Sequence, residues 1–143
     1  MHFLDIATIL LTGLMIGNEL CVSLFINPAL WKLDGYALTS ELAATLGRVM
    51  PFWYALCLIL LGAEAFLHWH EAGRDWILAA AILWIATIVY TLALLLPINN
   101  RIAKGIVQKA NWQDQHKLWD RRHRLRVLLL TVAMICLLFG VRA

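Results

Sequence analysis

The sequence has little charge, little proline and almost no cysteine. Only 15% of its 143 residues are Asp, Glu, Lys or Arg, whereas 62% are apolar. A soluble domain is usually about half apolar, so this scarcity of charge argues against a soluble globular protein and favours a membrane protein. At about 20 residues per span, the length permits one domain, residues 1–143, and at most about five helical spans.

Other common features are also missing. Cys21, Cys57 and Cys136 lie in separate apolar runs without CxxC spacing, which predicts small buried side chains rather than disulfides. The first residues carry no positively charged region and no A-x-A cleavage pattern, so we expect a retained span and not a signal peptide. No repeat is visible, and no basic patch indicates a nucleic-acid partner. The basic residues adjoin an apolar span, where lipid headgroups are the nearer anionic partner.

What is present is four apolar stretches, which predict spans at about residues 6–26, 51–68, 76–96 and 126–140. Proline does not continue a helix comfortably, so Asn27-Pro28 and Pro97 are expected to end the first and third spans. Pro51 is a favourable first residue for the second span. The predicted fold is all-α, a four-transmembrane-helix bundle. A short amphipathic helix is expected in the first loop, starting at Thr39 or Ser40.

The fourth helix is expected to be long and to extend into the cytoplasm, because no Pro or Gly interrupts residues 112–139. Orientation follows from the placement of Lys and Arg. Ten basic residues lie on one predicted side and only Arg74 and Arg142 on the other. We therefore expect an integral protein of a bacterial inner membrane, with both termini outside and the loops 31–50 and 97–125 cytoplasmic.

The loop 97–125 and the start of the fourth span contain a regular polar stripe, which is the predicted functional region. Its members, spaced by four, three, four and three, are Trp112, His116, Trp119, His123 and Arg126. This spacing places them on one face of an α-helix. Glu19 is an ionisable group inside the first span, which costs about 2.5–3.5 kcal/mol on insertion scales, so it is expected to face the protein interior or a water-filled cavity.

The predicted orientation brings Glu19, Asn99 and Arg101 to the same end as the stripe. Imidazoles move protons near neutral pH, Arg and Asn stabilise an oxyanion, and indoles provide flat apolar walls. Together they predict a pocket between helices at the membrane surface. The alternative is that Trp and Arg are interfacial anchors and that the histidines are solvated. Either tryptophan alone fits the anchor role, whereas His123 with Glu19 favours a functional site.

A second polar group is predicted at the opposite end. Glu64 and His68 lie four residues apart on one helical face, with His2, Asp5, His70 and Glu71 near. Carboxylates and imidazoles suit several transition metals, although Glu-x-x-x-His is not the Glu-x-x-His motif of di-iron bundles; solvated histidines at a helix end are the alternative. Tyr90 is expected to bond between helices or line the pocket.

Several segments resemble one family of small membrane proteins. They are the glycine-bearing first span ending near Asn27-Pro28, the Met50-Pro51 pair, Pro97-Ile98-Asn99-Asn100-Arg101, and Trp112 followed by Trp119-Asp120-Arg121-Arg122-His123-Arg124-Leu125-Arg126. This pattern is similar to that of the anthrone oxygenase-like family of four-span membrane proteins. The resemblance covers nearly the whole chain. It implies an oxidoreductase, a monooxygenase that converts an anthrone-type polyketide substrate into a quinone with dioxygen.

A mechanism for that chemistry can be assigned to residues. His123 is the expected base, oriented by Glu19 or Asp120, while Arg101 and Asn99 hold the enolate oxygen. The substrate rings are expected to contact Trp112, Trp119, His116, Tyr90 and Arg126. The enolate reacts with dioxygen directly, so no cofactor is required; a transition metal held by Glu19, His116 and His123 is the rival within this class.

Two non-catalytic alternatives stay open. One is a membrane module that binds a metal or a hydrophobic, quinone-like ligand, and the other is a structural or transport subunit, for which the usual paired repeats are lacking. The expected partners are an aromatic small molecule, dioxygen and the bilayer. Gly13 and Gly17 form a small-xxx-small pair that would let a second copy approach.

Overall fold

The computed structural model describes residues 2–143, and that range is helical apart from short turns. Four rods are long and apolar enough to cross a membrane. In chain order they comprise α1 (Phe3–Cys21), a π-helical turn (Val22–Ile26) and α2 (Asn27–Lys32); α3 (Tyr36–Leu67); α4 (Arg74–Tyr90), a second π-helical turn (Thr91–Leu95) and α5 (Leu96–Ala103); and, after a 3₁₀ turn (Lys109–Asn111), α6 (Trp112–Gly140). The predicted all-α, four-span bundle is confirmed, and the protein is an integral membrane protein.

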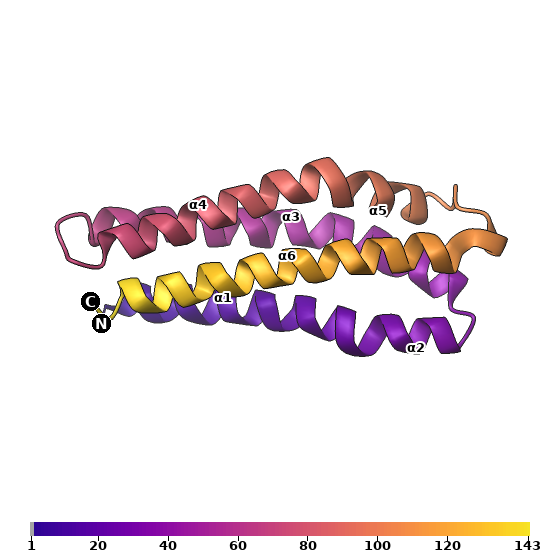
Figure 1. The fold of residues 1–143 in the computed structure, drawn as a ribbon, viewed down its shortest axis with the longest axis horizontal. Coiled ribbons are helices and arrows are strands. Elements are labelled where there is room, and N and C mark those ends of the chain that lie inside the picture. The colour runs from indigo at the N-terminus through magenta and orange to yellow at the C-terminus, as the bar shows by residue number, and fades with distance from the viewer. Residues whose placement is uncertain (1) are drawn as a thin grey trace.

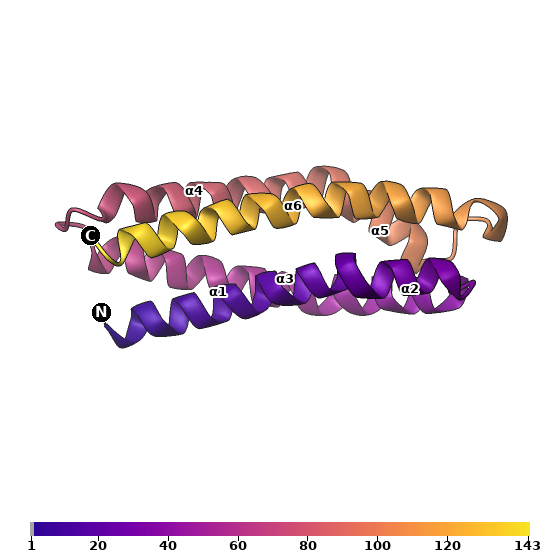
Figure 2. The ribbon, with the colours of Figure 1, turned by 60° about the horizontal axis from the view of Figure 1, so that its bottom comes forward.

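Successive rods are antiparallel and are joined by short connections (Figures 1 and 2). Both termini and the α3–α4 turn lie at one end, while the α2–α3 turn and the α5–α6 connection lie at the other (Figure 1). α6 packs against α4 and α1, and α3 also contacts both of these helices. The two ends that the sequence assigns to opposite sides of the membrane are therefore opposite ends of the bundle; which end faces the cytoplasm stays a prediction.

The prediction that Pro28 and Pro97 end helices is wrong, because both rods continue past their proline. In each case the residue just before the proline, Asn27 or Leu96, donates its backbone N–H five residues back, to Val22 or Thr91. Such a π-helical turn widens the helix locally, which relieves the clash between the proline ring and the preceding turn. The rods run on to Lys32 and Ala103.

The helix expected in the first loop exists, but it is not separate. α3 begins at Tyr36 and continues without a break to Leu67, so Pro51 lies inside a helix rather than at its start. Proline has no N–H, so the carbonyl of Gly47 lacks its usual helical donor. The long fourth helix is confirmed, since α6 runs from Trp112 to Gly140.

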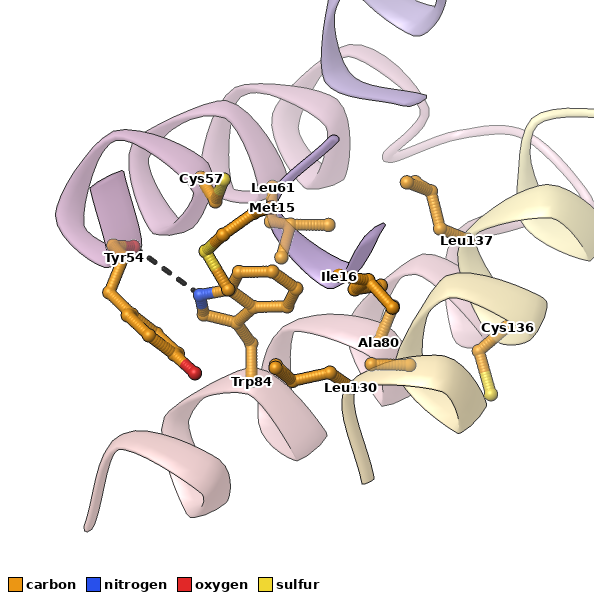
Figure 3. Packing of buried hydrophobic residues seen from close by; sticks show 11 residues of the cluster. Met15, Ile16, Tyr54, Cys57, Leu61, Ala80, Trp84, Leu130, Cys136 and Leu137 are labelled. Atoms are coloured by element: carbon orange, nitrogen blue, oxygen red, sulfur yellow. Dashed lines mark hydrogen bonds between the residues drawn. The ribbon is translucent and has the colours of Figure 1, made fainter. Parts of the chain in front are cut away.

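Buried apolar residues form two clusters, one around Trp84 toward the end that carries the termini and one around Leu95 and Trp119 toward the opposite end. Trp84 is buried among Met15, Leu61 and Leu130, and its indole donates to the carbonyl of Tyr54 at 3.3 Å (Figure 3). Cys57 and Cys136 are buried as expected, but Cys21 is exposed on the outer surface of the bundle. Exposed apolar side chains on all four rods form the surface that faces lipid.

Candidate functional site

The centre of the site is a buried ion pair between α1 and α6. Nη2 of Arg126 lies 2.6 Å from Oε2 of Glu19, and the two residues are 6% and 2% exposed. Tyr54 of α3 donates its hydroxyl to Oε1 of Glu19 at 3.3 Å, and the guanidinium of Arg126 lies over the Tyr54 ring at 5.7 Å. Buried charges in a bilayer require such pairing, so three helices are joined at this point.

His123 contacts both members of this ion pair. Its Nε2 lies 2.9 Å from the backbone carbonyl of Glu19, and its Nδ1 lies 2.8 Å from Nη2 of Arg126. A carbonyl only accepts and a guanidinium only donates, so Nε2 carries the proton and Nδ1 accepts. Both ring nitrogens are thus occupied, and the side chain is fully buried. His123 meets Glu19, as the sequence analysis expects, but through contacts inside the bundle.

Polar contacts between α6 and the first rod continue beyond α1, through the π-helical turn and into α2. Asp120 accepts from Ser23 at 2.9 Å and from Asn27 at 2.6 Å, and it pairs with Arg124 at 2.8 Å. Asp120 makes no hydrogen bond with His123, and Glu19 and Arg126 orient the imidazole instead. The sequence contains a pattern that indicates these contacts, because Glu19, Ser23 and Asn27 recur every four residues and so lie on one helical face.

The predicted stripe on α6 forms a continuous stack of rings. The centroids of Trp112 and His116 are 6.1 Å apart, those of His116 and Trp119 5.7 Å, and those of Trp119 and His123 4.7 Å. These separations are typical of favourable aromatic pairs. His116 also accepts from the indole of Trp31 at 3.0 Å. Each indole therefore packs against a histidine ring of α6. Both tryptophans are buried, so most of their ring surface contacts other residues of the protein.

A cavity of about 280 Å³ lies between α3 and the rod that contains α4 and α5. Its apolar walls include Met50, Leu58, Ile88 and Leu95, and its polar lining consists of Tyr54, Thr91, Asn99, Trp119 and Arg126. Pro51, Ala55 and Leu92 also line it and are exposed on the outer surface. The cavity therefore opens sideways, toward the region that lipid occupies, and Arg126 stands in its inner wall.

The structure brings only part of the predicted site to this cavity. Asn99 lines it and donates to the carbonyl of Ala43 at 3.0 Å. Arg101 is exposed and does not line it, because α5 continues past Pro97 and turns Arg101 outward. Trp112 and Tyr90 are also absent from its walls, and the Tyr90 hydroxyl donates to the carbonyl of Arg122 at 3.3 Å.

Two other predicted residues lie behind the cavity. His116 borders only a much smaller space, and His123 does not line the cavity. The residue that the sequence analysis missed is Tyr54. Its signal is weak, because a tyrosine in an apolar span is common and only the fold shows that it faces Glu19.

The predicted metal ligands Glu19, His116 and His123 do not converge on one point in this structure. The Trp119 ring lies between the two imidazoles, and both ring nitrogens of His123 are already hydrogen-bonded. Among residues 2–143, the group with metal-ligand spacing is Asp5, Glu64 and His68 at the other end of the bundle, all buried. Burial lowers the pKa of His68, but its hydrogen bonds to Asp5 and Glu71 outweigh this and raise the pKa above its ordinary value.

Comparison with known proteins supports the family expected from the sequence. No curated protein and no solved structure matched the chain. The family model described as anthrone oxygenase matches residues 41–136, which include the cavity lining and the whole ring stack. Glu19 lies outside the matched range. Since the match extends over well more than half of the sequence, the chain belongs to the anthrone oxygenase family.

Proposed function

We propose that the protein is a membrane-embedded oxygenase that oxidises a planar, anthrone-type aromatic substrate bound in the cavity between α3 and α5. The observation that carries this proposal is the position of Arg126. Among the described residues that line this largely apolar cavity, Arg126 alone carries a charge, and its buried Nε has no hydrogen-bond partner within residues 2–143. A few polar groups in an apolar pocket are typical of small-molecule sites.

The cavity suits a hydrophobic substrate that arrives from the bilayer. Its volume of about 280 Å³ is at the lower end of the roughly 300–1,000 Å³ of small-molecule sites, which favours a compact ligand. The exposed rim residues Pro51 and Leu92 provide entry between helices without passage through water. Because Pro51 cannot donate to the carbonyl of Gly47, this carbonyl is free to accept a hydrogen bond from a substrate hydroxyl.

The proposed chemistry begins with removal of a proton from the central methylene of the substrate. The Tyr54 hydroxyl oxygen takes this proton as it passes its own to Oε1 of Glu19, and Arg126 stabilises the enolate oxygen. The negative charge thus moves from Glu19 to the substrate while staying beside the same guanidinium. No net charge is created in the dry cavity, which is the condition under which preorganised electrostatics lower a barrier most.

The enolate then reacts with dioxygen. A carbon–oxygen bond forms, and the resulting peroxide anion takes a proton from the Tyr54 hydroxyl, which recovers its own from Glu19. The hydroperoxide then loses water, and the methylene carbon becomes a carbonyl. One atom of dioxygen ends in the product and the other in water. In this scheme His123 is a positioning residue, because it holds Arg126 and does not reach the cavity; this differs from its expected role as the base.

The test compares two tyrosines in purified protein reconstituted in lipid discs. Tyr54→Phe keeps the ring beneath Arg126 and removes the proton path, so oxygen uptake and quinone formation with an added anthrone should fall at least tenfold. Tyr90→Phe removes a hydroxyl outside the cavity and should leave both rates unchanged. Wild-type turnover at the uncatalysed rate would refute an oxygenase; thermal stabilisation by the anthrone without oxygen uptake would instead support a ligand-binding module.

A further inference from the structure

We infer that Asp5, Glu64 and His68 form a second site, which binds a divalent transition-metal ion such as Zn²⁺ and fastens the start of α1 to the end of α3. Asp5 and Glu64 are fully buried and His68 is 3% exposed. The ligand atoms of the three side chains lie within 4.8 Å of one another. The inference is independent of the proposed function, because the site is about 20 Å along α1 from Glu19.

Each side chain has one polar atom held by a neighbour and another directed at a shared point. Oε1 of Glu64 accepts from the Thr8 hydroxyl at 2.8 Å. Oδ2 of Asp5 accepts from the backbone N–H of His2. The imidazole Nδ1 of His68 bonds to the carboxylate of Glu71. A histidine whose second nitrogen is held by a carboxylate is the arrangement usually found at protein metal sites, because it fixes the ring and its tautomer.

The remaining atoms are Oδ1 of Asp5, Oε2 of Glu64 and Nε2 of His68. Nε2 lies 3.1 Å from Oδ1 of Asp5 and 3.3 Å from Oε2 of Glu64. A tetrahedral Zn²⁺ site with bonds of about 2.0–2.1 Å has ligand atoms about 3.3 Å apart. The imidazole nitrogen therefore already lies at the distance of an adjacent ligand from both carboxylates, and the ligand atoms of the two carboxylates lie within 4.8 Å of each other.

The charges and the hydrogen bonding of these three residues favour a bound cation. Two carboxylates are buried beside one imidazole, and Oε2 of Glu64 has no hydrogen-bond partner although it is shielded from solvent. Buried carboxylates are normally paired or bound to a metal. Two oxygen ligands and one nitrogen ligand suit divalent first-row metals. Because Asp5 and Glu64 belong to different helices, an ion shared by them couples metal binding to bundle stability.

The test uses Zn²⁺ alone, added to full-length protein stripped with a chelator in detergent. The wild type should retain one equivalent after desalting, and its thermal midpoint should rise by several degrees. His68→Gln should retain little metal and show no rise. The matched control His70→Gln changes an exposed histidine two residues away and should behave as the wild type. Equal uptake by the His68→Gln and wild-type proteins would overturn the inference.

Glu64→Gln provides a second variant that separates a metal site from a structural cluster. It keeps an acceptor for Thr8 and removes one of two neighbouring buried carboxylates. Without metal, its thermal midpoint should equal or exceed that of the stripped wild type, and added Zn²⁺ should no longer raise it. A midpoint well below that of the stripped wild type, or an undiminished response to Zn²⁺, would contradict the inference. Failure of the wild type to retain Zn²⁺ would also do so, whatever the oxygenase assay shows.

Discussion

Arg126 and Glu19, which lie 107 positions apart in the chain, form a buried ion pair with an N–O distance of 2.6 Å. This pair joins α1 to α6, and one of its members lines the cavity. The same contact therefore serves the fold and the proposed chemistry. Substitutions can separate its energetic role from its functional role.

Breaking the pair from one side should be more harmful than removing it. Glu19→Gln or Arg126→Met leaves one charge buried without its partner, which typically costs about 3–5 kcal/mol. The double variant removes both charges and should be less destabilised than the sum of the two single variants. Denaturant unfolding in detergent, followed by tryptophan fluorescence, measures the coupling. Strictly additive losses would show that the two side chains do not interact.

Blocking the side opening of the cavity should abolish substrate binding without disturbing the polar centre. Ala55 is exposed and lines the cavity, so Ala55→Trp fills the entrance. Ala86 is exposed on α4 away from the cavity and provides the matched control, Ala86→Trp. An anthrone should raise the thermal midpoint of the control and of the wild type, but not that of Ala55→Trp. Equal responses in both variants would place the binding site elsewhere.

The two histidines of the ring stack should differ in their effect on activity. Phenylalanine at either position preserves a ring in the stack. His116→Phe removes the acceptor of the Trp31 indole, which should cost about 1 kcal/mol of stability and leave oxygen uptake unchanged. His123→Phe removes the contact with Arg126 and should lower kcat at least tenfold with little change in KM. Similar kcat values for the two variants would remove His123 as a positioning residue.

Gly140, at the end of α6, tests the packing of α6 against α4, and Gly17 of α1 provides the control. A Cβ at Gly140 would lie 2.4 Å from Cγ1 of Ile77 and 3.1 Å from the carbonyl oxygen of Gly73, whereas a Cβ at Gly17 would meet nothing within 4 Å. Gly140→Ala should therefore destabilise the bundle by about 1–3 kcal/mol. Gly17→Ala should be neutral or slightly stabilising, because alanine favours helices. A loss of dimer in Gly17→Ala, measured by light scattering, would instead locate a contact between two copies at this face.

Much of this protein follows from the sequence because its determinants are local. Apolar runs of the length of a bilayer specify four helices, since the backbone must satisfy its own hydrogen bonds in lipid. The spacing of Trp112, His116, Trp119 and His123 places them on one face whatever the remainder of the chain does. The motifs around Pro97 and Trp119 are sufficient to indicate the family. Glu19 is predictably internal because a lone carboxylate is costly in lipid.

Only the tertiary structure decided which partners meet across helices and which residues reach the cavity. Pro28 and Pro97 were expected to end helices, but a π-helical turn before each lets the rod continue, and this carries Arg101 away from the cavity. Tyr54 contacts Glu19 because of how α3 is rotated about its axis in the bundle, which no local pattern encodes. Asp5 is expected near His68, but only the packing of α1 against α3 brings the two side chains to 3.1 Å. Helical periodicity gives the face a side chain occupies, whereas the packing of four rods decides what that face meets.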